Sequence, residues 1–229
     1  MIKAQKIIWA EKLFQFYMLR LLKKSFYSFY TFGEIPKPKN NLPTILLPNH
    51  STWWDGFFIY LLNHCFFKRT TYLMMLEEHL SKHKFFSKIG VFSINPNNSK
   101  STIKTLNYTA ELLKNQKNGV PQICIFPQGE LLAWGTRPLQ VKKGIEVILK
   151  KYQGDVNLVL VGIKVESIRE QLPEVFFNFS DSSTVNYENF NFTDFTNKLE
   201  NQLEKLNHKI IYERETAKPF YSGKKSLGN

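Results

Sequence analysis

Short apolar runs alternate with segments of helical periodicity through most of this chain, and this alternation restricts the possible folds more than any other feature. The runs predict strands at 43–47, 72–76, 91–94, 120–126, 156–165 and 175–179. The segments between them predict helices at 53–67, at 77–88, from a cap at Asn98 or Ser99 to Gly119, at 141–152, and from a cap at Thr193 onward. Alternating strands and helices pack as a largely parallel sheet with helices on both faces. We therefore predict an α/β fold with a mostly parallel, mixed sheet flanked by helices.

The two ends of the chain differ from this middle part. Residues 1–33 predict one or two amphipathic helices that associate with a membrane and end near Gly33. A polar link that contains prolines follows, and residues 40–212 hold the α/β domain. Residues 213–229 are polar and without periodicity, and we expect them to be a mobile tail.

Basic and apolar residues are interleaved in the N-terminal segment. Residues 1–40 hold eight lysines and arginines against two glutamates, half of the net charge of +12 of the chain. Large apolar residues such as Trp9, Leu13 and Phe16 lie between them. This combination is typical of a helix in the interface of a bilayer, and favours a membrane surface over a nucleic acid as partner. The alternative is a helix whose apolar side faces the core of its own domain.

The hydrophobic runs and the cysteines of the sequence bear on where the protein is located and on whether it holds a metal. No uncharged run approaches the roughly 20 residues that span a bilayer, so we expect a peripheral or monotopic protein. The two cysteines, Cys65 and Cys124, lie in apolar segments and are expected as buried thiols in a reducing compartment, at the cytoplasmic face of the membrane. No cysteine–histidine cluster has the spacing of a zinc site, and we expect neither a metal nor a cofactor.

The segment Asn49–Asp55 follows the first strand and combines a histidine with a carboxylate. His50 and Asp55 are five positions apart, which is about 140° around a regular helix, so there they would not meet. They meet if His50 lies before the helix and folds back over its first turn, with Ser51 or Thr52 as the helix cap. Asp55 then holds the imidazole in one tautomer, which suits a base whose substrate brings the hydroxyl. The alternative is a structural hydrogen bond.

Reactive groups collect at the carboxyl ends of the strands in a parallel sheet. Three segments follow strands in this way, namely 49–55, 95–99 and 127–130. We expect them to lie together. The glycine of Gln128-Gly129-Glu130 fits such a site and also fits a tight turn after a strand.

Residues 43–165 resemble the 1-acylglycerol-3-phosphate (lysophospholipid) acyltransferase family in the order and spacing of their motifs. The first motif of that family, N-H-x-x-x-x-D, stands here as Asn49–Asp55. The second, G-x-x-F-[IV]-x-R, is similar to Gly90–Pro96, and the third, F-P-E-G-[TS]-R, to Phe126–Leu131. An F-K-x-G element follows as Val141–Gly144.

The resemblance implies the glycerolipid acyltransferase fold and transfer of an acyl chain from acyl-CoA or acyl-carrier protein to a lyso-lipid hydroxyl at a membrane. It implies that His50 is the general base and that Asp55 orients it, without a covalent acyl-enzyme. Substrate-binding residues are expected in and after the motifs. These are Asn49, Phe126, Pro127, Gln128, Gly129, Glu130, Arg137, Lys142 and Lys143.

The chain departs from the family pattern where the head group of the acceptor would be held. The motif arginines are replaced by Pro96 and Leu131, the glutamate by Gln128, and a hydroxyl residue by Glu130. Neither proline nor leucine can grip a phosphate as a guanidinium does. We therefore expect an acceptor other than lysophosphatidic acid, with a neutral, zwitterionic or amine-bearing head, such as a lyso-aminolipid. The alternative is that other cations, such as Arg137, have taken over these contacts.

Two readings from other classes compete with the acyltransferase. A catalytically silent lipid-binding descendant fits the weakened third motif but not the intact His50–Asp55 pair. A thioesterase or lipase would use His50 to activate water, although the chain has no G-x-S-x-G nucleophile elbow.

Overall fold

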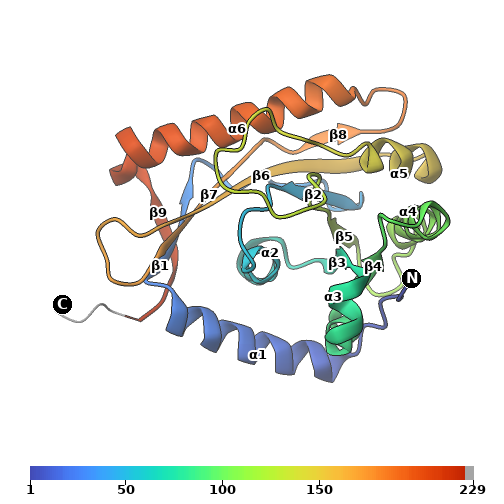
Figure 1. Ribbon diagram of the computed structural model, residues 1–229, viewed down its shortest axis with the longest axis horizontal. Coiled ribbons are helices and arrows are strands. Elements are labelled where there is room, and N and C mark those ends of the chain that lie inside the picture. The colour runs from blue at the N-terminus through green and yellow to red at the C-terminus, as the bar shows by residue number, and fades with distance from the viewer. Residues whose placement is uncertain (225–229) are drawn as a thin grey trace.

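A nine-stranded sheet runs through the centre of the protein, in the computed structural model that describes residues 1–224 (Figure 1). The strands are β1 (Ser28–Phe32), β2 (Thr44–Pro48), β3 (Thr70–Leu76), β4 (Val91–Ile94), β5 (Pro121–Cys124), β6 (Val156–Glu166), β7 (Glu174–Phe179), β8 (Ser183–Val185) and β9 (Lys218–Ser222). The helices are α1 (Ile8–Ser25), α2 (Asp55–Leu62), α3 (Glu77–Lys82), α4 (Ser99–Lys114), α5 (Gly144–Tyr152) and α6 (Phe192–Tyr212).

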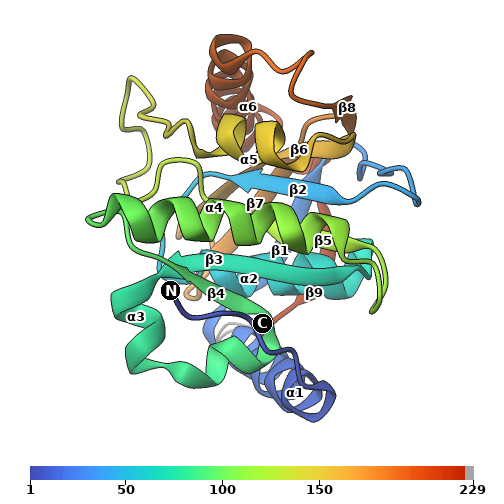
Figure 2. The ribbon, with the colours of Figure 1, turned by 90° about the vertical axis from the view of Figure 1, so that its right-hand side faces the viewer.

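The sheet is mixed and mostly parallel, as predicted. Its order is β4-β3-β5-β2-β6-β7-β1-β9, with β8 beside β6. Neighbours from β4 to β6 are parallel, as are β1 and β7, whereas β6 is antiparallel to β7 and β8, and β1 is antiparallel to β9. The carboxyl ends of β2, β3 and β5 therefore lie at one edge of the sheet, which Figure 2 shows for β2 and β3.

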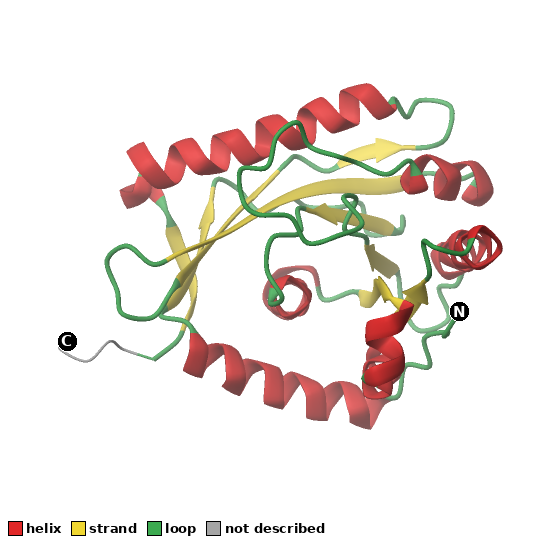
Figure 3. Ribbon diagram, viewed as in Figure 1, coloured by secondary structure: helices red, strands yellow, loops and turns green. Residues whose placement is uncertain are grey.

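Helices cover both faces of the sheet (Figure 3). The apolar side chains of α4, α5 and α6 pack in one core, and those of α1, α2 and α3 pack in another on the opposite face. β2 lies between the two cores and contributes to both, because successive side chains along a strand point to opposite faces of the sheet. Its Leu46 lies in the core under α2, while Ile45 and Leu47 lie in the core under α4 and α5.

One side of α1 belongs to the domain core. Ala10, Phe14, Met18 and Leu22 are spaced every four residues and are buried. The ring of Phe14 lies 5.8 Å from that of Phe57 in α2. Part of the N-terminal segment is therefore core-facing, as the alternative prediction held. Within residues 1–224, no helix is both long enough and apolar enough to cross a membrane.

The end of the predicted N-terminal helical segment is a strand instead. α1 stops at Ser25, and Ser28–Phe32 form β1 between β7 and β9. Aromatic and β-branched residues favour such a strand, and its ladder partners come from residues 175–178 and 218–222. The prediction of a helix over residues 26–33 is therefore wrong, because the main-chain hydrogen-bond partners of this segment are strands that are distant in the sequence.

The polar C-terminal segment is built into the sheet as far as the structure describes it. β9 pairs with β1, and Arg214 forms an ion pair with Glu174 of β7. The Arg214 guanidinium also lies 4.8 Å from the ring centre of Phe176. The prediction of a mobile tail is thus wrong for residues 213–224, and its last five residues lie outside the described part of the chain.

Several predicted helix boundaries shift by a few residues. The predicted helix 53–67 is α2 followed by a π-helical turn at Asn63–Phe67, and 77–88 is α3 followed by a 3-10 turn at Lys84–Ile89. Asn98 caps α4 as predicted, since its Oδ1 accepts from the Ser101 N–H at 2.9 Å. The cap of α6 is Asn191 rather than Thr193, because the Asn191 side chain reaches the Asp194 N–H.

Candidate active site

His50 and Asp55 meet at the carboxyl end of β2, where the chain turns into α2. The Nδ1 atom of His50 lies 2.8 Å from Oδ2 of Asp55. Asp55 is the first residue of α2 and is 1% exposed, while His50 precedes the helix. The histidine therefore folds back over the first turn of the helix, which is the geometry that the spacing required.

The Asp55 carboxylate is held by four hydrogen bonds. Besides His50, its Oδ2 accepts from the N–H groups of Ser51 (2.8 Å) and Thr52 (2.9 Å). Its Oδ1 accepts from the Thr52 hydroxyl at 2.7 Å. The predicted capping by Ser51 or Thr52 holds only in part: Thr52 Oγ1 accepts from the Trp54 N–H at 3.2 Å just before α2, but the N-cap position itself is Trp54, without a side-chain cap. The carboxylate instead organises the turn that precedes it, which fixes its direction towards His50.

One nitrogen of the His50 ring remains available for chemistry. A carboxylate only accepts hydrogen bonds, so Nδ1 of the neutral imidazole carries the proton and Nε2 has the free lone pair. The Phe126 ring stacks on the imidazole at 4.0 Å between centroids and 20° between planes. The His50 side chain is 22% exposed. The imidazole is therefore covered on one face and reachable from outside, as a general base must be.

The segment after β5 joins this pair directly. Phe126 accepts at its carbonyl from the Gly129 N–H at 3.0 Å, which closes a turn with Pro127 and Gln128 at its centre. Gly129 has φ +76°, a conformation that favours glycine. Gln128 is buried, and its Oε1 accepts from the main-chain N–H of His50 at 2.6 Å. The predicted site segment is thus also a tight turn, and both readings of its glycine describe one structure.

The cationic residues after this turn take different directions. Lys142 donates its main-chain N–H to the Pro127 carbonyl at 2.8 Å, and its side-chain stem passes Gly129. The ammonium of Lys143 lies 5.6 Å from the ring centre of Phe192, at the start of α6. Arg137 is exposed and donates to the carbonyl of its neighbour Thr136. Of these three predicted substrate contacts, the structure brings Lys142 to the turn and directs Lys143 to another helix.

Glu130 and the segment 95–99 are not bonded to His50 or Asp55. Glu130 is exposed, and within residues 1–224 it makes no hydrogen bond or ion pair. The segment 95–99 follows β4, and β3 and β5 separate β4 from β2. Its hydrogen bonds stay within the turn and α4, such as Thr102 Oγ1 to the Asn95 carbonyl. Of the three segments expected together, the structure joins 49–55 and 127–130 by a direct hydrogen bond.

Asn49 has a different role from the predicted contact with substrate. It is 1% exposed, and its side chain continues the ladder between β2 and β6. Its Oδ1 accepts from the Ile163 N–H at 2.7 Å, and its Nδ2 donates to the Ile163 carbonyl and to Ser51 Oγ, each at 3.0 Å. Both polar atoms are therefore engaged inside the protein, because β2 ends one residue before the site and needs an anchor there.

Two contacts of the site carried no signal in the sequence. The Leu132 N–H donates to the His50 carbonyl at 3.0 Å, and any residue except proline can make this main-chain bond. The buried Cys124 lies behind the site, and burial followed by the charge of Asp55 raises the pKa of its thiol. Cys124 therefore stays protonated and does not serve as a nucleophile.

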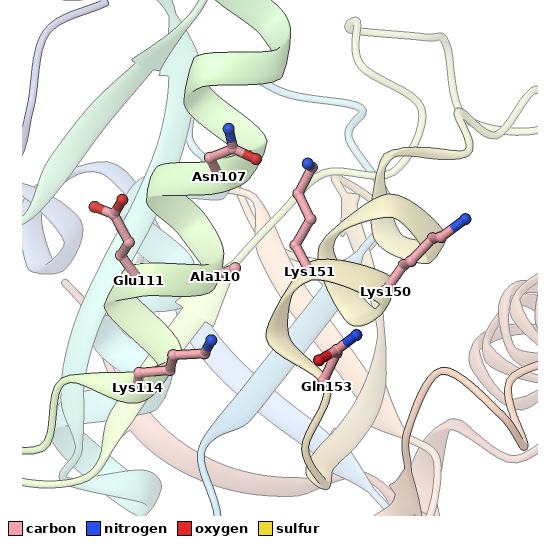
Figure 4. Close-up of a pocket in the computed structure, with 7 residues that line it drawn as sticks. All are labelled: Asn107, Ala110, Glu111, Lys114, Lys150, Lys151 and Gln153. Atoms are coloured by element: carbon pink, nitrogen blue, oxygen red, sulfur yellow. The ribbon is translucent and has the colours of Figure 1, made fainter.

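A surface depression of about 350 Å³ lies away from this site, between the C-terminal halves of α4 and α5 (Figure 4). Lys114, Lys150 and Lys151 line it, together with polar side chains. Lysines in the last turn of a helix are favoured by the helix dipole, so the fold accounts for them. Within residues 1–224, no group of three or more metal-ligating side chains is present.

Comparison with known proteins gives the family and the fold of this chain. The sequence model of the family described as Acyltransferase matches residues 32–164, which is more than half of the chain. The chain belongs to the acyltransferase family. It is therefore an acyltransferase enzyme, as the motifs predicted.

A solved structure with a similar fold is the 1-acyl-sn-glycerophosphate (LPA) acyltransferase PlsC from Thermotoga maritima. The TM-score is 0.55 and the sequence identity 18%, over 88% of this chain and 78% of that chain. The predicted fold of this acyltransferase is thereby confirmed. A comparison with curated proteins finds no match.

Proposed function

We propose that this acyltransferase moves a fatty acyl chain from an acyl thioester, acyl-CoA or acyl-carrier protein, to a hydroxyl of a lyso-lipid at the cytoplasmic surface of a membrane. The observation that carries the proposal is the 2.8 Å contact between His50 Nδ1 and a fully buried Asp55. Within residues 1–224, no hydroxyl or thiol is hydrogen-bonded to Nε2 of His50, and the Thr52 hydroxyl donates to Asp55 instead. Ser51 Oγ accepts from Asn49, and Cys124 is buried with a raised pKa. A base without its own nucleophile fits a substrate that brings the hydroxyl.

The reaction follows from the tautomer of His50. Nε2 takes the proton of the acceptor hydroxyl while the oxygen attacks the thioester carbonyl carbon. The resulting imidazolium is stabilised by Asp55 through Nδ1–H. The tetrahedral intermediate then collapses, the carbon–sulfur bond breaks, and the imidazolium proton passes to the leaving thiolate. The products are the acylated lipid and the free thiol, and His50 is again neutral.

The turn at 127–130 is where we place the head group of the acceptor. The flexible cation Lys142 passes this turn, whereas Leu131 stands in place of the motif arginine and Glu130 adds a negative charge. This charge pattern supports a lyso-lipid with a neutral, zwitterionic or amine-bearing head over lysophosphatidic acid. A bidentate guanidinium–phosphate contact has no equivalent in these side chains.

The outer side of α1 supports a membrane surface as partner. Opposite the buried stripe, Trp9, Leu13 and Phe16 are 56%, 53% and 67% exposed, and Lys12 and Arg20 are exposed beside them. Aromatic and aliphatic bulk flanked by basic residues fits an anionic lipid surface. Thus α1 packs on the domain with one side and presents a second apolar side outward.

The catalytic proposal is tested by thioester consumption with and without a panel of lyso-lipids. We expect consumption that depends on the acceptor, and its loss in His50→Ala. His79→Ala is the matched control, because His79 is exposed on α3. Consumption without an acceptor would indicate hydrolysis instead, and activity that survives in His50→Ala would remove His50 as the base. Preference for lysophosphatidic acid would overturn the acceptor assignment.

The membrane proposal is tested separately by sedimentation with anionic vesicles. The variant Trp9→Ser/Leu13→Ser/Phe16→Ser is expected to lose most vesicle binding and to keep its melting temperature, since these side chains are exposed. Ile211→Ser/Tyr212→Ser is the control, because these α6 residues are 58% and 70% exposed. Equal vesicle binding by both variants would contradict the assignment to α1.

A further inference from the structure

Gln128 is an uncharged, buried side chain that is bonded to the main chain of His50. It is 3% exposed, and its Oε1 accepts from the His50 N–H at 2.6 Å. The side chain makes no other hydrogen bond to residues 1–224. The orientation of the amide is therefore set by His50, because a peptide N–H requires an acceptor and only Oε1 can accept.

This bond completes the set of contacts that hold His50. Its Nδ1 is fixed by Asp55, one ring face by Phe126, and its carbonyl by the Leu132 N–H. The main-chain N–H of His50 lies between the end of β2 and the start of α2, so neither element supplies it with a hydrogen-bond acceptor. Without Gln128 this donor would be unpaired in a largely enclosed site, and the main chain that carries the imidazole would lose an anchor.

The charge of the side chain at this position also matters for the imidazole. The family motif has a glutamate here, whereas this chain has a neutral amide. A carboxylate bonded to the His50 N–H would lie within a few ångström of the ring and would stabilise the imidazolium. The ionisable groups from the neighbouring elements are Asp55 of α2, Cys124 of β5, and Glu130, Arg137 and Lys142 of the loop. The neighbouring strand β6 adds Lys164 and Glu166, and these two form an ion pair with each other. Among the described residues, Asp55 is the one carboxylate bonded to His50.

We propose that Gln128 is a positioning residue for His50, and that its neutral amide makes this contact without adding a second negative charge beside the imidazole, as the glutamate of the family motif would. Gln128 was expected to bind substrate, and the structure gives its Oε1 to the catalytic main chain instead. This inference rests on the proposed role of His50 as the base.

The deciding variant is Gln128→Glu, which keeps the size and the acceptor but adds a negative charge. A nearby carboxylate raises the pKa of an imidazole, so the base becomes protonated at a higher pH. We expect the acidic limb of the kcat/KM profile to move up by about one pH unit, with a roughly tenfold loss of activity below it. An NMR titration of the imidazole is expected to shift the same way. Gln140→Glu, the same change at an exposed position of this loop, should leave both unchanged.

A second variant separates position from charge. Gln128→Met keeps the length but has no acceptor for the His50 N–H, so we expect kcat to fall about tenfold with an unmoved acidic limb. If this variant fails to fold, Gln128→Glu still decides, since it retains the hydrogen bond. An acidic limb in Gln128→Glu that coincides with the wild type overturns the inference. His50→Ala distinguishes the two failures, because activity without His50 refutes the base itself, whereas unaltered Gln128 variants of a His50-dependent enzyme refute only the positioning role.

Discussion

The segments Asn49–Asp55 and Phe126–Leu131 meet through one hydrogen bond and one stacked ring pair, but they differ in how firmly they are held. In the first, one buried carboxylate joins His50, Ser51 and Thr52. The second is anchored up to Gln128 and is exposed from Gly129 onward. The difference fits the two tasks that we propose for them, since the position of a base must be precise, whereas head-group contacts can change without disturbing the fold.

The largest effect is expected where the first segment loses its carboxylate. Asp55→Asn leaves an amide that can hold either tautomer of His50 and that does not stabilise the imidazolium. We expect kcat to fall by about 10³-fold with a small change in KM, measured by steady-state kinetics. Asp181→Asn, at an exposed loop position, is the control. Near wild-type kcat in Asp55→Asn would show that the pair is structural.

A specificity change is expected where the second segment regains its family side chain. Leu131 is 52% exposed, so Leu131→Arg should fold normally and place a guanidinium beside the turn. We expect the ratio of kcat/KM for lysophosphatidic acid over the best neutral-head acceptor to rise about tenfold. Leu131→Gln controls for polarity without charge. An unchanged ratio would mean that the head group does not approach this turn.

A smaller effect is expected from a single bond to the Asp55 carboxylate. Thr52→Val keeps the shape of the side chain but removes the hydroxyl that donates to Asp55 Oδ1 at 2.7 Å and accepts from the Trp54 N–H at 3.2 Å. A bond to a charged group contributes about 1.5–3 kcal/mol at most, and three other bonds still hold Asp55. We expect a threefold to tenfold loss of kcat and a slightly lower melting temperature. Thr136→Val, which removes a hydroxyl in the loop, is the control. If both variants had the same kcat and melting temperature, the Thr52 hydroxyl would not be needed to hold Asp55.

The local parts of the fold were predictable because local patterns specify them. The strand Val91–Ile94 and the cap Asn98 follow from an apolar run and an asparagine before a helix. By contrast, β1 and β9 pair across about 190 residues, and no local period reports such a partner. The same limit applies to α1. Its periodicity predicted an amphipathic helix, but it did not predict which of its apolar residues are buried in the core and which are exposed.

The sequence by itself determined the family and the candidate catalytic pair: a histidine and a carboxylate five residues apart, at a strand-to-helix turn, in the order of an acyltransferase. Only the tertiary structure decided what the surrounding polar residues do. It placed Asn49 and Gln128 inward on main-chain partners, and it directed Lys142 to the turn at Gly129 but Lys143 to Phe192 of α6. The physical reason is that spacing along the chain constrains neighbours within one turn, whereas the partners of a buried amide or a long cation come from segments that only the packed sheet brings together.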